Sequence, residues 1–579
     1  MSITDRFQIL TPWQKAWLPC LVLAGAVFAA YVNVYQNEFV WDDLSSIIQN
    51  KALLHWSNFL DYISGKTNDR FYRPVMVLLY FFVYHSFGLS KIAFHGLNVL
   101  LQAANACFVY RLGGRLGFYQ RASFAAALLW GVHPMWSEAV AYVSGIASLL
   151  VAFFLMSGLL VLLPDFKPRR SGAEQTPGAF AQQIPGAFAP RKFWLASLFM
   201  LLALGSKESA VVFPALVMST MFLASEKRLH PAIYLRTWPL WLLAAAYVSG
   251  HFILHPGAFI SYDYQDSNHV EFYENNIINR ILTSLATLPM YFSLFVWPRD
   301  LHMDWHFPIV VTPWAWQVLA GVVIVALSLW QIIRRGKHSL PLTWGLLWFA
   351  IAFSPNSGIL MPLNTIFAEN WIYLPTIGLS LGAAQRMLVW IKTFHSKKPL
   401  MAAAVVVALA ATGLGTKTYL QNEFLHDPVS LFDNIIKYHP ESPMARYALG
   451  KFYFDHKSYQ KAAEQLHIME YYDYSVDKDY AVGVHMILAL IDLNVALEKN
   501  GTISIQDVAA ALPTAKDIPG AIEELRLAQQ IDPKAYPANA SLAAIYYYLG
   551  DKKQGDYYSA IAEKNSPKDK IDLIKNADN

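Results

Sequence analysis

The stretch Asn37-Glu38-Phe39-Val40-Trp41-Asp42-Asp43 follows an apolar run over residues 16–34, and this junction decides how the chain is laid out. A helix that spans a bilayer needs roughly 20 apolar residues, so the run is long enough to cross one. Two adjacent carboxylates just beyond such a helix are costly unless water solvates them or the protein uses them. The pair could also cap a helix over residues 44–48, since Asp is a favoured N-cap residue. Capping and chemistry are compatible, so we expect one carboxylate to act and the other to cap or position.

The composition is that of a membrane protein with several spans. Of 579 residues, 55% are hydrophobic and only 15% are charged, against about 25% charged residues in soluble domains. The net charge of +4 is too small to suggest a nucleic-acid partner. The two cysteines, Cys20 and Cys107, both lie in apolar runs, which excludes a disulfide framework and a Cys-based metal or redox site. Near Gln421 the chain becomes amphipathic and rich in charge, so we predict a membrane domain over residues 1–420 and a soluble helical domain over 421–579.

The apolar runs and the basic residues between them predict a topology. Lys and Arg favour cytoplasmic loops, which places the N-terminus in the cytoplasm and predicts about 11 transmembrane helices. These spans are expected over residues 16–34, 92–110, 124–132, 140–163, 193–204, 211–223, 240–254, 313–333, 342–353, 371–391 and 401–415. Two further apolar segments, 74–87 and 277–296, are expected to lie at the membrane interface or to re-enter it. The basic clusters then fall on one side of the membrane.

The conspicuous polar residues fall on the other side, the periplasmic or lumenal face. They are Asp42, Asp43, Tyr72, Arg73, His133, Glu138, Lys207, Glu208 and Glu369. Ionisable groups at membrane depth are candidates for function. Their gathering on one face therefore predicts a single polar cavity at the outer surface, in which the residues other than the Asp pair bind substrate.

Taken singly, these residues also have ordinary structural interpretations. Tyr72-Arg73 would anchor a helix at the interface by snorkelling, and His133, which precedes a proline, would end a helix. Lys207-Glu208 would form a local ion pair, and Glu369 would cap the helix that follows it. The functional hypothesis depends on the set rather than on any one member.

The residue types favour sugar transfer from a lipid phosphate. The spans carry almost no charge, which disfavours a transporter, and a glycosidase needs both an acid and a base beside the bond. A phosphate leaving group needs cations instead, which Arg73 and Lys207 can supply, Arg with a planar fork that suits phosphate. The acceptor hydroxyl needs one carboxylate base. One base and one attack imply inversion at the anomeric carbon.

In their order and residue identities, the motifs resemble those of the GT-C superfamily of membrane glycosyltransferases. The resemblance is closest to the multi-span O-mannosyltransferases with C-terminal tetratricopeptide (TPR) repeats. The motifs are residues 37–43, Tyr72-Arg73-Pro74, residues 87–98, residues 133–145, Ser206-Lys207-Glu208 and residues 364–375. The resemblance implies an outer-face site, a polyprenyl-phosphate sugar donor, inversion and a pair of interfacial helices after the first span. It also implies that the first acidic motif supplies the base, which we assign to Asp42 with Asp43 as the alternative. Such families typically carry Glu-Arg where this chain has Glu369-Asn370, so the sugar, mannose included, stays open.

The resemblance does not firmly imply a cofactor. Acidic pairs can hold Mg²⁺ or Mn²⁺ through oxygen, and oligosaccharyl-type members of the superfamily use a metal. Mannosyl-type members generally resemble metal-free designs. We therefore assign no metal ligand and keep a divalent cation as an alternative.

The C-terminal residues fit the TPR pattern of large and small residues within 34 positions. The matching positions are Leu449, Gly450, Tyr453, Ala462 and Leu466; then Ala521, Leu525, Ala528 and Pro533; then Leu542, Ala543, Tyr546, Gly555, Ala562 and Pro567. They predict an α-solenoid of about three helical pairs, with the middle repeat split by an insert near residues 501–519. The domain would be a scaffold, or it would dock a protein acceptor or partner beside the active site.

The leading hypothesis is thus an integral, multi-pass glycosyltransferase of a bacterial inner membrane or the endoplasmic reticulum. It would take a sugar from a lipid-linked donor in the membrane to a protein hydroxyl, with a glycan or lipid acceptor as the alternative. The competing hypothesis is a non-catalytic membrane scaffold whose TPR groove recruits envelope proteins.

Overall fold

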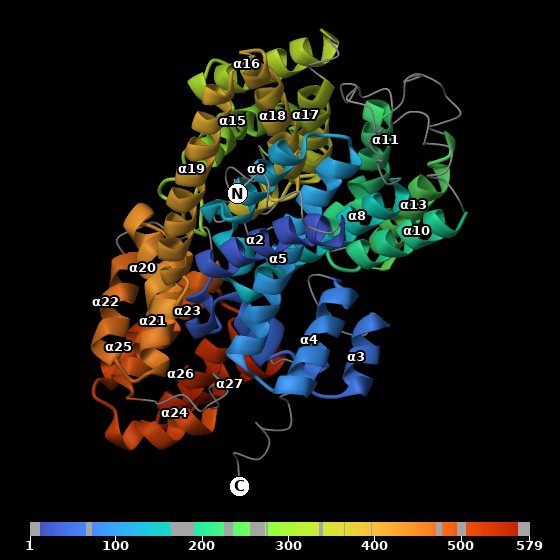
Figure 1. Cartoon of the computed structure of the whole chain (residues 1–579). Helices are drawn as coiled ribbons and strands as arrows, with labels where there is room; N and C mark the ends of the chain where they lie inside the picture. Colours follow the sequence, from blue (N-terminus) through green and yellow to red (C-terminus); the bar gives the residue numbers. More distant parts are fainter. Residues whose placement is uncertain are drawn as a thin grey trace. The chain divides into compact units, whose positions relative to one another are not determined.

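The computed structural model describes residues 12–64, 72–163, 190–224, 235–254, 273, 276–334, 340–363, 365–394, 396–470, 478–494 and 505–565. Every regular element in these ranges is a helix, which confirms the predicted all-α class (Figure 1). The described chain divides into two compact units, with the boundary between Asp427 and Pro428. Each unit is described by itself.

The helices of the first unit overlap the predicted apolar runs, although the first ends at Ala30 rather than at residue 34. They are α2 (Pro12–Ala30), α5 (Lys91–Arg115), α6 (Gln120–Gly131), α8 (Ile146–Leu162), α10 (Pro190–Leu204), α11 (Phe213–Ala224), α13 (Trp238–Leu254), α16 (Trp316–Ile333), α17 (Leu340–Phe353), α18 (Pro375–Lys392) and α19 (Lys397–Glu423). The runs predicted to lie at the interface are also helical, as α4 (Pro74–Phe87) and α15 (Ile277–Val296).

Four helical segments of the described chain are long and apolar enough to cross a membrane: Lys91–Arg115, Val143–Leu162, Trp316–Ile333 and Lys397–Glu423. The first and third agree with predicted spans over 92–110 and 313–333. These segments make the chain an integral membrane protein. The number of crossings and their direction remain predictions.

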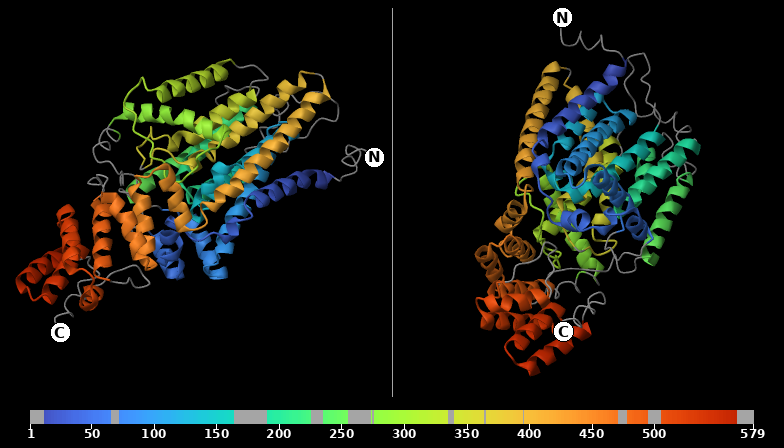
Figure 2. Two further views of the ribbon diagram at one scale, coloured as in Figure 1. Left: turned by 90° about the vertical axis from the view of Figure 1, so that its left-hand side faces the viewer. Right: turned by 90° about the horizontal axis from the view of Figure 1, so that it is seen from below.

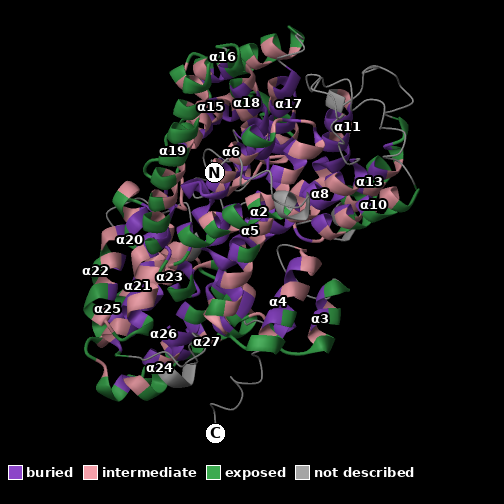
Figure 3. Ribbon diagram, in the orientation of Figure 1, coloured by how far each residue is buried: buried purple, intermediate pink, exposed green. Residues whose placement is uncertain are grey.

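Burial separates the inner helices of this unit from the outer ones (Figure 3). The apolar window of the Val143–Leu162 segment is 78% buried, whereas that of α16 is 11% buried and that of α19 is 0% buried. Exposed apolar surface is unfavourable in water but not in hydrocarbon. The outward faces of α16 and α19 therefore suit contact with lipid.

The first and last helices of the unit meet at their C-terminal ends (Figure 2). The side chain of Asn422, in α19, donates to the carbonyl of Ala30 at 3.2 Å and to Oδ1 of Asn33 at 3.1 Å. Asn33 donates in turn to the carbonyl of Tyr419 at 2.9 Å. These bonds fix the end of α2, and hence the start of the stretch that carries Asp42 and Asp43.

Helices α17 and α18 pack side by side on a seam of glycines (Figure 1). A Cβ atom at Gly378 would overlap the ring of Trp348, and one at Gly345 would lie 2.5 Å from the carbonyl oxygen of Gly378. Gly378 and Gly382 have the spacing of the small-residue motif that lets membrane helices approach closely. The seam fixes α18, which begins at Pro375, five residues after Asn370.

Helices α3 (Trp56–Ile63) and α4 form an aromatic pair. The ring of Phe81 lies 5.4 Å from that of Trp56 and 5.9 Å from that of Phe59, between ring centroids. Trp56 and Leu60 are about half exposed on the outside of the pair. Short helices with outward apolar side chains suit a membrane interface, which supports the predicted interfacial role.

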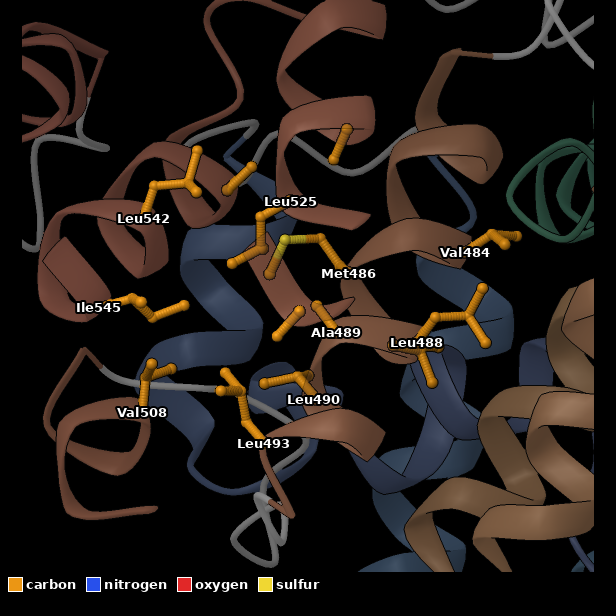
Figure 4. Close-up of a cluster of buried hydrophobic side chains, with 14 of the residues drawn as sticks. Val484, Met486, Leu488, Ala489, Leu490, Leu493, Val508, Leu525, Leu542 and Ile545 are labelled. Atoms are coloured by element: carbon orange, nitrogen blue, oxygen red, sulfur yellow. The ribbon is translucent and has the colours of Figure 1, made fainter. Parts of the chain in front are cut away.

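The second unit is a stack of helices around its own core. Its helices are α20 (Pro428–Tyr438), α21 (Pro443–Asp455), α22 (Tyr459–Glu470), α23 (Lys478–Asp492), α24 (Ile505–Ala511), α25 (Ile518–Ile531), α26 (Tyr536–Tyr548) and α27 (Lys552–Asn565). They pack in pairs, α21 with α22, α23 with α25 and α26 with α27. Leu490, Leu493, Leu525, Leu542 and Ile545 belong to this core (Figure 4). The pairing fits the predicted solenoid, but the repeat family stays a prediction, and residues 501–504 and 567 lie outside the described ranges.

Candidate active site

Asp43 is a buried carboxylate that holds the acidic stretch in place. Its Oδ2 accepts from the backbone N–H of Val40 at 3.2 Å, and its Oδ1 accepts from the N–H and the hydroxyl of Ser144 at 2.7 and 2.6 Å. Burial raises the pKa of Asp43 to about 7, against the hydrogen bonds from Ser144 and Val40, which lower it. The π-helix Leu44–Ile48 begins after Asp43, but the Asp43 side chain makes no capping bond to it. Its role is therefore to position the stretch rather than to cap the helix.

Asp42 differs from its neighbour because its side chain is exposed. Its backbone N–H donates to the hydroxyl of Tyr142 at 2.9 Å, and its carbonyl accepts from Ser45 at 3.1 Å. Trp41, just before it, has φ 51°, a left-handed conformation that is rare for a bulky residue. Such strain persists only where the surrounding structure holds it, often at functional sites. Of the two carboxylates, Asp42 is the one that an acceptor molecule can reach.

Arg73 forms an ion pair with Glu208 near the start of α4. Its Nη2 lies 3.0 Å from Oε1 and 3.3 Å from Oε2 of Glu208. The backbone N–H of Val75 donates to the carbonyl of Gly205 at 2.9 Å, which brings the two chain segments together. Burial works to raise the pKa of Glu208, but Arg73 and Lys207 together hold it at about 2. Glu208 is therefore a carboxylate at neutral pH.

Tyr72 has a local structural role. Its hydroxyl donates to the carbonyl of Ile63 at 3.0 Å, and its ring stacks on that of Tyr62 with centroids 5.8 Å apart. The hydroxyl of Tyr62 accepts from the N–H of Arg73 at 2.7 Å. These contacts tie the end of α3 to the residue that carries the guanidinium.

Lys207 joins this ion pair to the helix that anchors Asp43. Its Nζ lies 3.2 Å from the hydroxyl of Ser148, which is one helical turn after Ser144. The anchors of Asp43 and of Lys207 therefore stand on successive turns of the same chain segment. Burial and the charge of Arg73 lower the pKa of Lys207 to about 8, while Glu208 and Glu138 act to raise it.

Glu138 and Glu369 are two further carboxylates, and Glu138 lies within electrostatic range of both Lys207 and Glu369. Oε1 of Glu138 accepts from Nδ2 of Asn370 at 2.6 Å, and Oε2 accepts from the Asn370 N–H at 3.2 Å. Burial raises the pKa of Glu138 to about 7. Oε1 of Glu369 accepts from the N–H of His302 at 2.9 Å and from the indole of Trp305 at 3.0 Å. Burial, and then the charge of Glu138, raise the pKa of Glu369 well above its ordinary range.

His133 is set apart from this group. Its Nε2 lies 3.0 Å from the carbonyl of Phe295, and its Nδ1 accepts from the N–H of Met135 at 3.4 Å. Burial lowers its pKa to about 4, so the ring is neutral at physiological pH. The structural interpretation that His133 stands at a helix terminus fits, but His133 begins the short helix Pro134–Trp136 rather than ending α6, which stops at Gly131.

The structure thus gathers most of the predicted residues and adds several that the sequence did not single out. Lys207 lies within electrostatic range of Arg73, Glu208 and Glu138, and Glu138 within that of Glu369. The pair Asp42–Asp43 is linked to this cluster through Ser144 and Ser148, which stand one helical turn apart. The added residues are Tyr142, Ser144, Ser148, Trp305 and the Asn370 side chain. Tyr142 and Ser144 stand in a motif that carries the resemblance, but no feature of the sequence shows that they contact residues 42 and 43. Within the described ranges, no group of three His, Cys, Asp or Glu side chains is arranged to hold a metal ion.

These features define a class: an all-helical integral membrane protein with a cluster of carboxylates and cations beside a pair of short aromatic helices. No protein-family model and no solved structure matches the chain. It is similar to the human protein O-mannosyl-transferase TMTC4 (26% identical, over 76% of this chain and 64% of the relative). It is also similar to human protein O-mannosyl-transferase TMTC1 (26%, over 75% and 53%). A third relative is the protein O-mannosyl-transferase F38B6.6 of Caenorhabditis elegans (22%, over 74% and 59%).

These similarities confirm the resemblance to O-mannosyltransferases that the motifs predicted. The chain spans between 53% and 64% of the length of these three curated relatives.

Proposed function

We propose that the chain is an inverting glycosyltransferase that moves a sugar from a polyprenyl-phosphate donor to a hydroxyl on a protein, at the outer face of the membrane. The observation that carries the proposal is the contrast between the adjacent carboxylates, with Asp43 buried in hydrogen bonds and Asp42 exposed beside it. A general base must reach the proton that it removes. The names of the relatives support protein O-glycosylation.

In the proposed reaction, the acceptor oxygen attacks the anomeric carbon as its proton passes to the Asp42 carboxylate. The bond from the anomeric carbon to the phosphate oxygen breaks, and the lipid phosphate leaves with that electron pair. Cations aimed at a developing phosphate charge stabilise such a step. Arg73 and Lys207 would serve here, each held by a neighbouring acidic or hydroxyl group.

The surroundings of the site support a lipid-linked donor. The α3–α4 pair presents apolar side chains outward, and α4 begins at the residue after Arg73. A donor with a long prenyl chain needs its phosphate at the membrane surface and its chain in hydrocarbon. No metal is required by this scheme, since the cations act on the leaving phosphate. The second unit, as a TPR solenoid on the same face, would dock the protein acceptor.

The test is transfer by the purified full-length chain in lipid nanodiscs, with a panel of radiolabelled polyprenyl-phosphate sugars and acceptor peptides. Asp42→Asn keeps the shape and removes the base, so we expect kcat to fall by about 10²–10⁴-fold. Glu423→Gln is the matched control, because Glu423 is an exposed acidic residue of the same unit. Undiminished transfer by Asp42→Asn would rule out the assignment. NMR of the product should show the anomer opposite to that of the donor.

The alternative function, a non-catalytic scaffold, makes the opposite prediction. No donor in the panel would then be consumed, and the Asp42→Asn chain would support recruitment of envelope proteins as well as the unsubstituted chain does.

A further inference from the structure

Residues 142–144 contact both members of the acidic pair. The hydroxyl of Tyr142 accepts from the backbone N–H of Asp42, and Ser144 donates twice to Asp43. This turn lies at the entrance to α8, about 100 residues from the acidic stretch. The direction of the Asp42 carboxylate therefore depends on where the turn is held.

Two buried side chains hold this turn from behind. Nδ2 of Asn98, in α5, donates to the carbonyls of Tyr142 at 3.0 Å and Val143 at 3.2 Å. The hydroxyl of Tyr80, in α4, donates to the carbonyl of Val143 at 2.9 Å. Both residues are fully buried. Three donors from two helices thus converge on two consecutive carbonyls.

The Asn98 amide is costly where it lies. Its Oδ1 is buried and has no hydrogen-bond partner among the described residues. An unsatisfied buried acceptor destabilises a fold, and an apolar side chain of similar size would avoid this. The contribution of Asn98 is therefore its two donors, and these act on the turn that carries the contacts to the acidic pair.

We propose that Asn98 and Tyr80 are positioning residues of the transferase, which fix residues 142–144 so that Asp42 points at the acceptor hydroxyl. This inference rests on the proposed function. The physical reason is the steep dependence of rate on geometry, since a displacement of about 1 Å can cost about 10²-fold. Neither residue needs to touch the substrates, because each acts through the turn.

The chain offers a matched control for each residue. Asn105 lies two turns after Asn98 on α5, and its Nδ2 also makes two bonds, to the carbonyl of Leu149 and the hydroxyl of Tyr373, both at 3.0 Å. Neither of these bonds reaches residues 142–144, so Asn105→Asp repeats the chemical change of Asn98→Asp away from the turn. Tyr31 is as buried as Tyr80, but its hydroxyl makes no hydrogen bond in the described chain, so Tyr31→Phe controls for Tyr80→Phe.

The experiment measures kcat and donor KM for these four variants of the full-length chain in nanodiscs. We expect kcat to fall about 10–100-fold in Asn98→Asp and about 3–10-fold in Tyr80→Phe, with donor KM within about twofold. The control variants should keep kcat within about twofold of the unsubstituted chain. Equal kcat in the test and control variants would overturn the inference. The proposed function would still stand in that case if Asp42→Asn were inactive in the same assay.

Hydrogen–deuterium exchange tests the positioning without any activity. The amides of Asp42 and Ser144 donate to Tyr142 and Asp43, so they report directly on the turn. Both amides should exchange at least about 10-fold faster in Asn98→Asp and Tyr80→Phe than in the controls. Unchanged exchange would overturn the inference, whether or not a donor is found.

Discussion

Asn370 holds Glu138 with two donors, its side-chain amide at 2.6 Å and its backbone N–H at 3.2 Å. Asn370 is a neutral donor, where the resemblance described above implies an Arg. The carboxylate of Glu138 therefore has Lys207 as the cation that lowers its pKa. Burial outweighs this help, and Glu138 titrates near neutral pH.

The first prediction is that stability falls as the pH rises through this titration. The pKa of Glu138 is about 7 in the folded chain, whereas a Glu side chain that nothing perturbs, as in the unfolded chain, has a pKa of 4.5. Between these values the folded state binds more protons than the unfolded state, so each rise in pH destabilises it. We expect a loss on the order of 1–3 kcal/mol between pH 5 and pH 7.5, seen as a falling Tm in scanning fluorimetry.

Two substitutions separate the groups that titrate in this window. Asp43 also has its pKa raised to about 7 by burial. Glu138→Gln and Asp43→Asn should each flatten part of the slope, and the double variant should keep the part that comes from Glu369, whose pKa burial also raises. An undiminished slope in the double variant would show that neither Glu138 nor Asp43 causes it.

The second prediction concerns Asn370 itself. Asn370→Asp replaces the amide donor with a carboxylate facing that of Glu138, and like charges at hydrogen-bond distance repel. The variant should lose about 1–3 kcal/mol of stability at pH 8 and much less at pH 5.5, where Glu138 is protonated. Thermal unfolding at the two pH values measures this. Asn276→Asp should be nearly neutral at both, because Asn276 is exposed and its Oδ1 accepts from the N–H groups of Ile278 and Asn279, bonds that Asp can also accept.

The third prediction concerns the Arg73–Glu208 pair. The guanidinium side chain is 16% exposed and the carboxylate 36% exposed, so removing Arg73 leaves Glu208 beside Lys207 alone. Arg73→Gln should raise donor KM about 10-fold or more, since it removes a charge-assisted contact worth about 1.5–3 kcal/mol. Arg73→Lys should recover part of that loss, because Lys keeps the charge without the planar fork. Equal KM values for Gln and Lys would show that charge at residue 73 is irrelevant to the donor.

The sequence predicted the helices of the first unit well because membrane length and apolarity leave few alternatives. Residues 74–87 and 277–296 are helical at the predicted bounds, and α19 differs mainly in extending beyond 401–415 at both ends. Helices continue into polar flanks that hydropathy does not mark. The positions of these helices do not fix how many of them cross the membrane, because many are shorter than a bilayer is thick.

The sequence predicted which polar residues gather, but not what each one does. The charge of the loops predicted that Arg73, Glu138 and Lys207 share one side of the membrane, and the structure places Lys207 within electrostatic range of the other two. The difference between Asp42 and Asp43 depends on Ser144, 101 residues after Asp43, and local sequence carries no such information. His133 was included because it is ionisable, and only the structure shows that backbone groups occupy both of its ring nitrogens.

The fourth prediction tests the glycine seam between α17 and α18. Gly378→Ala places a methyl group against the Trp348 ring, and overpacking of this kind costs about 1–3 kcal/mol. Because α18 follows Glu369 and Asn370, transfer should fall as well. Gly413→Ala is the control: a Cβ there meets nothing within 4 Å, and helix propensity favours Ala. A Tm of Gly378→Ala equal to that of the control would contradict the close packing.

The fifth prediction tests the core of the second unit. Leu525 is 1% exposed and Leu527, two residues later on α25, is 36% exposed. Leu525→Ala should cost about 2–5 kcal/mol, whereas Leu527→Ala should change stability by less than about 0.5–1 kcal/mol. Limited proteolysis of the full-length chain should release fragments of this unit far sooner in the first variant. Similar digestion rates would mean that Leu525 does not pack in this core.

One backbone bond of the first unit has a mechanical consequence. The N–H of Glu38 donates to the carbonyl of His426 at 2.7 Å, four residues before Asp42 and two before the second unit begins at Pro428. The tether of the second unit is thus fastened to the stretch that carries the acidic pair. A pull on that tether would load this bond together with the covalent chain into α19, which ends at Glu423. Tension at the junction would therefore reach the stretch with Asp42 and Asp43, and change how firmly its first residues are held.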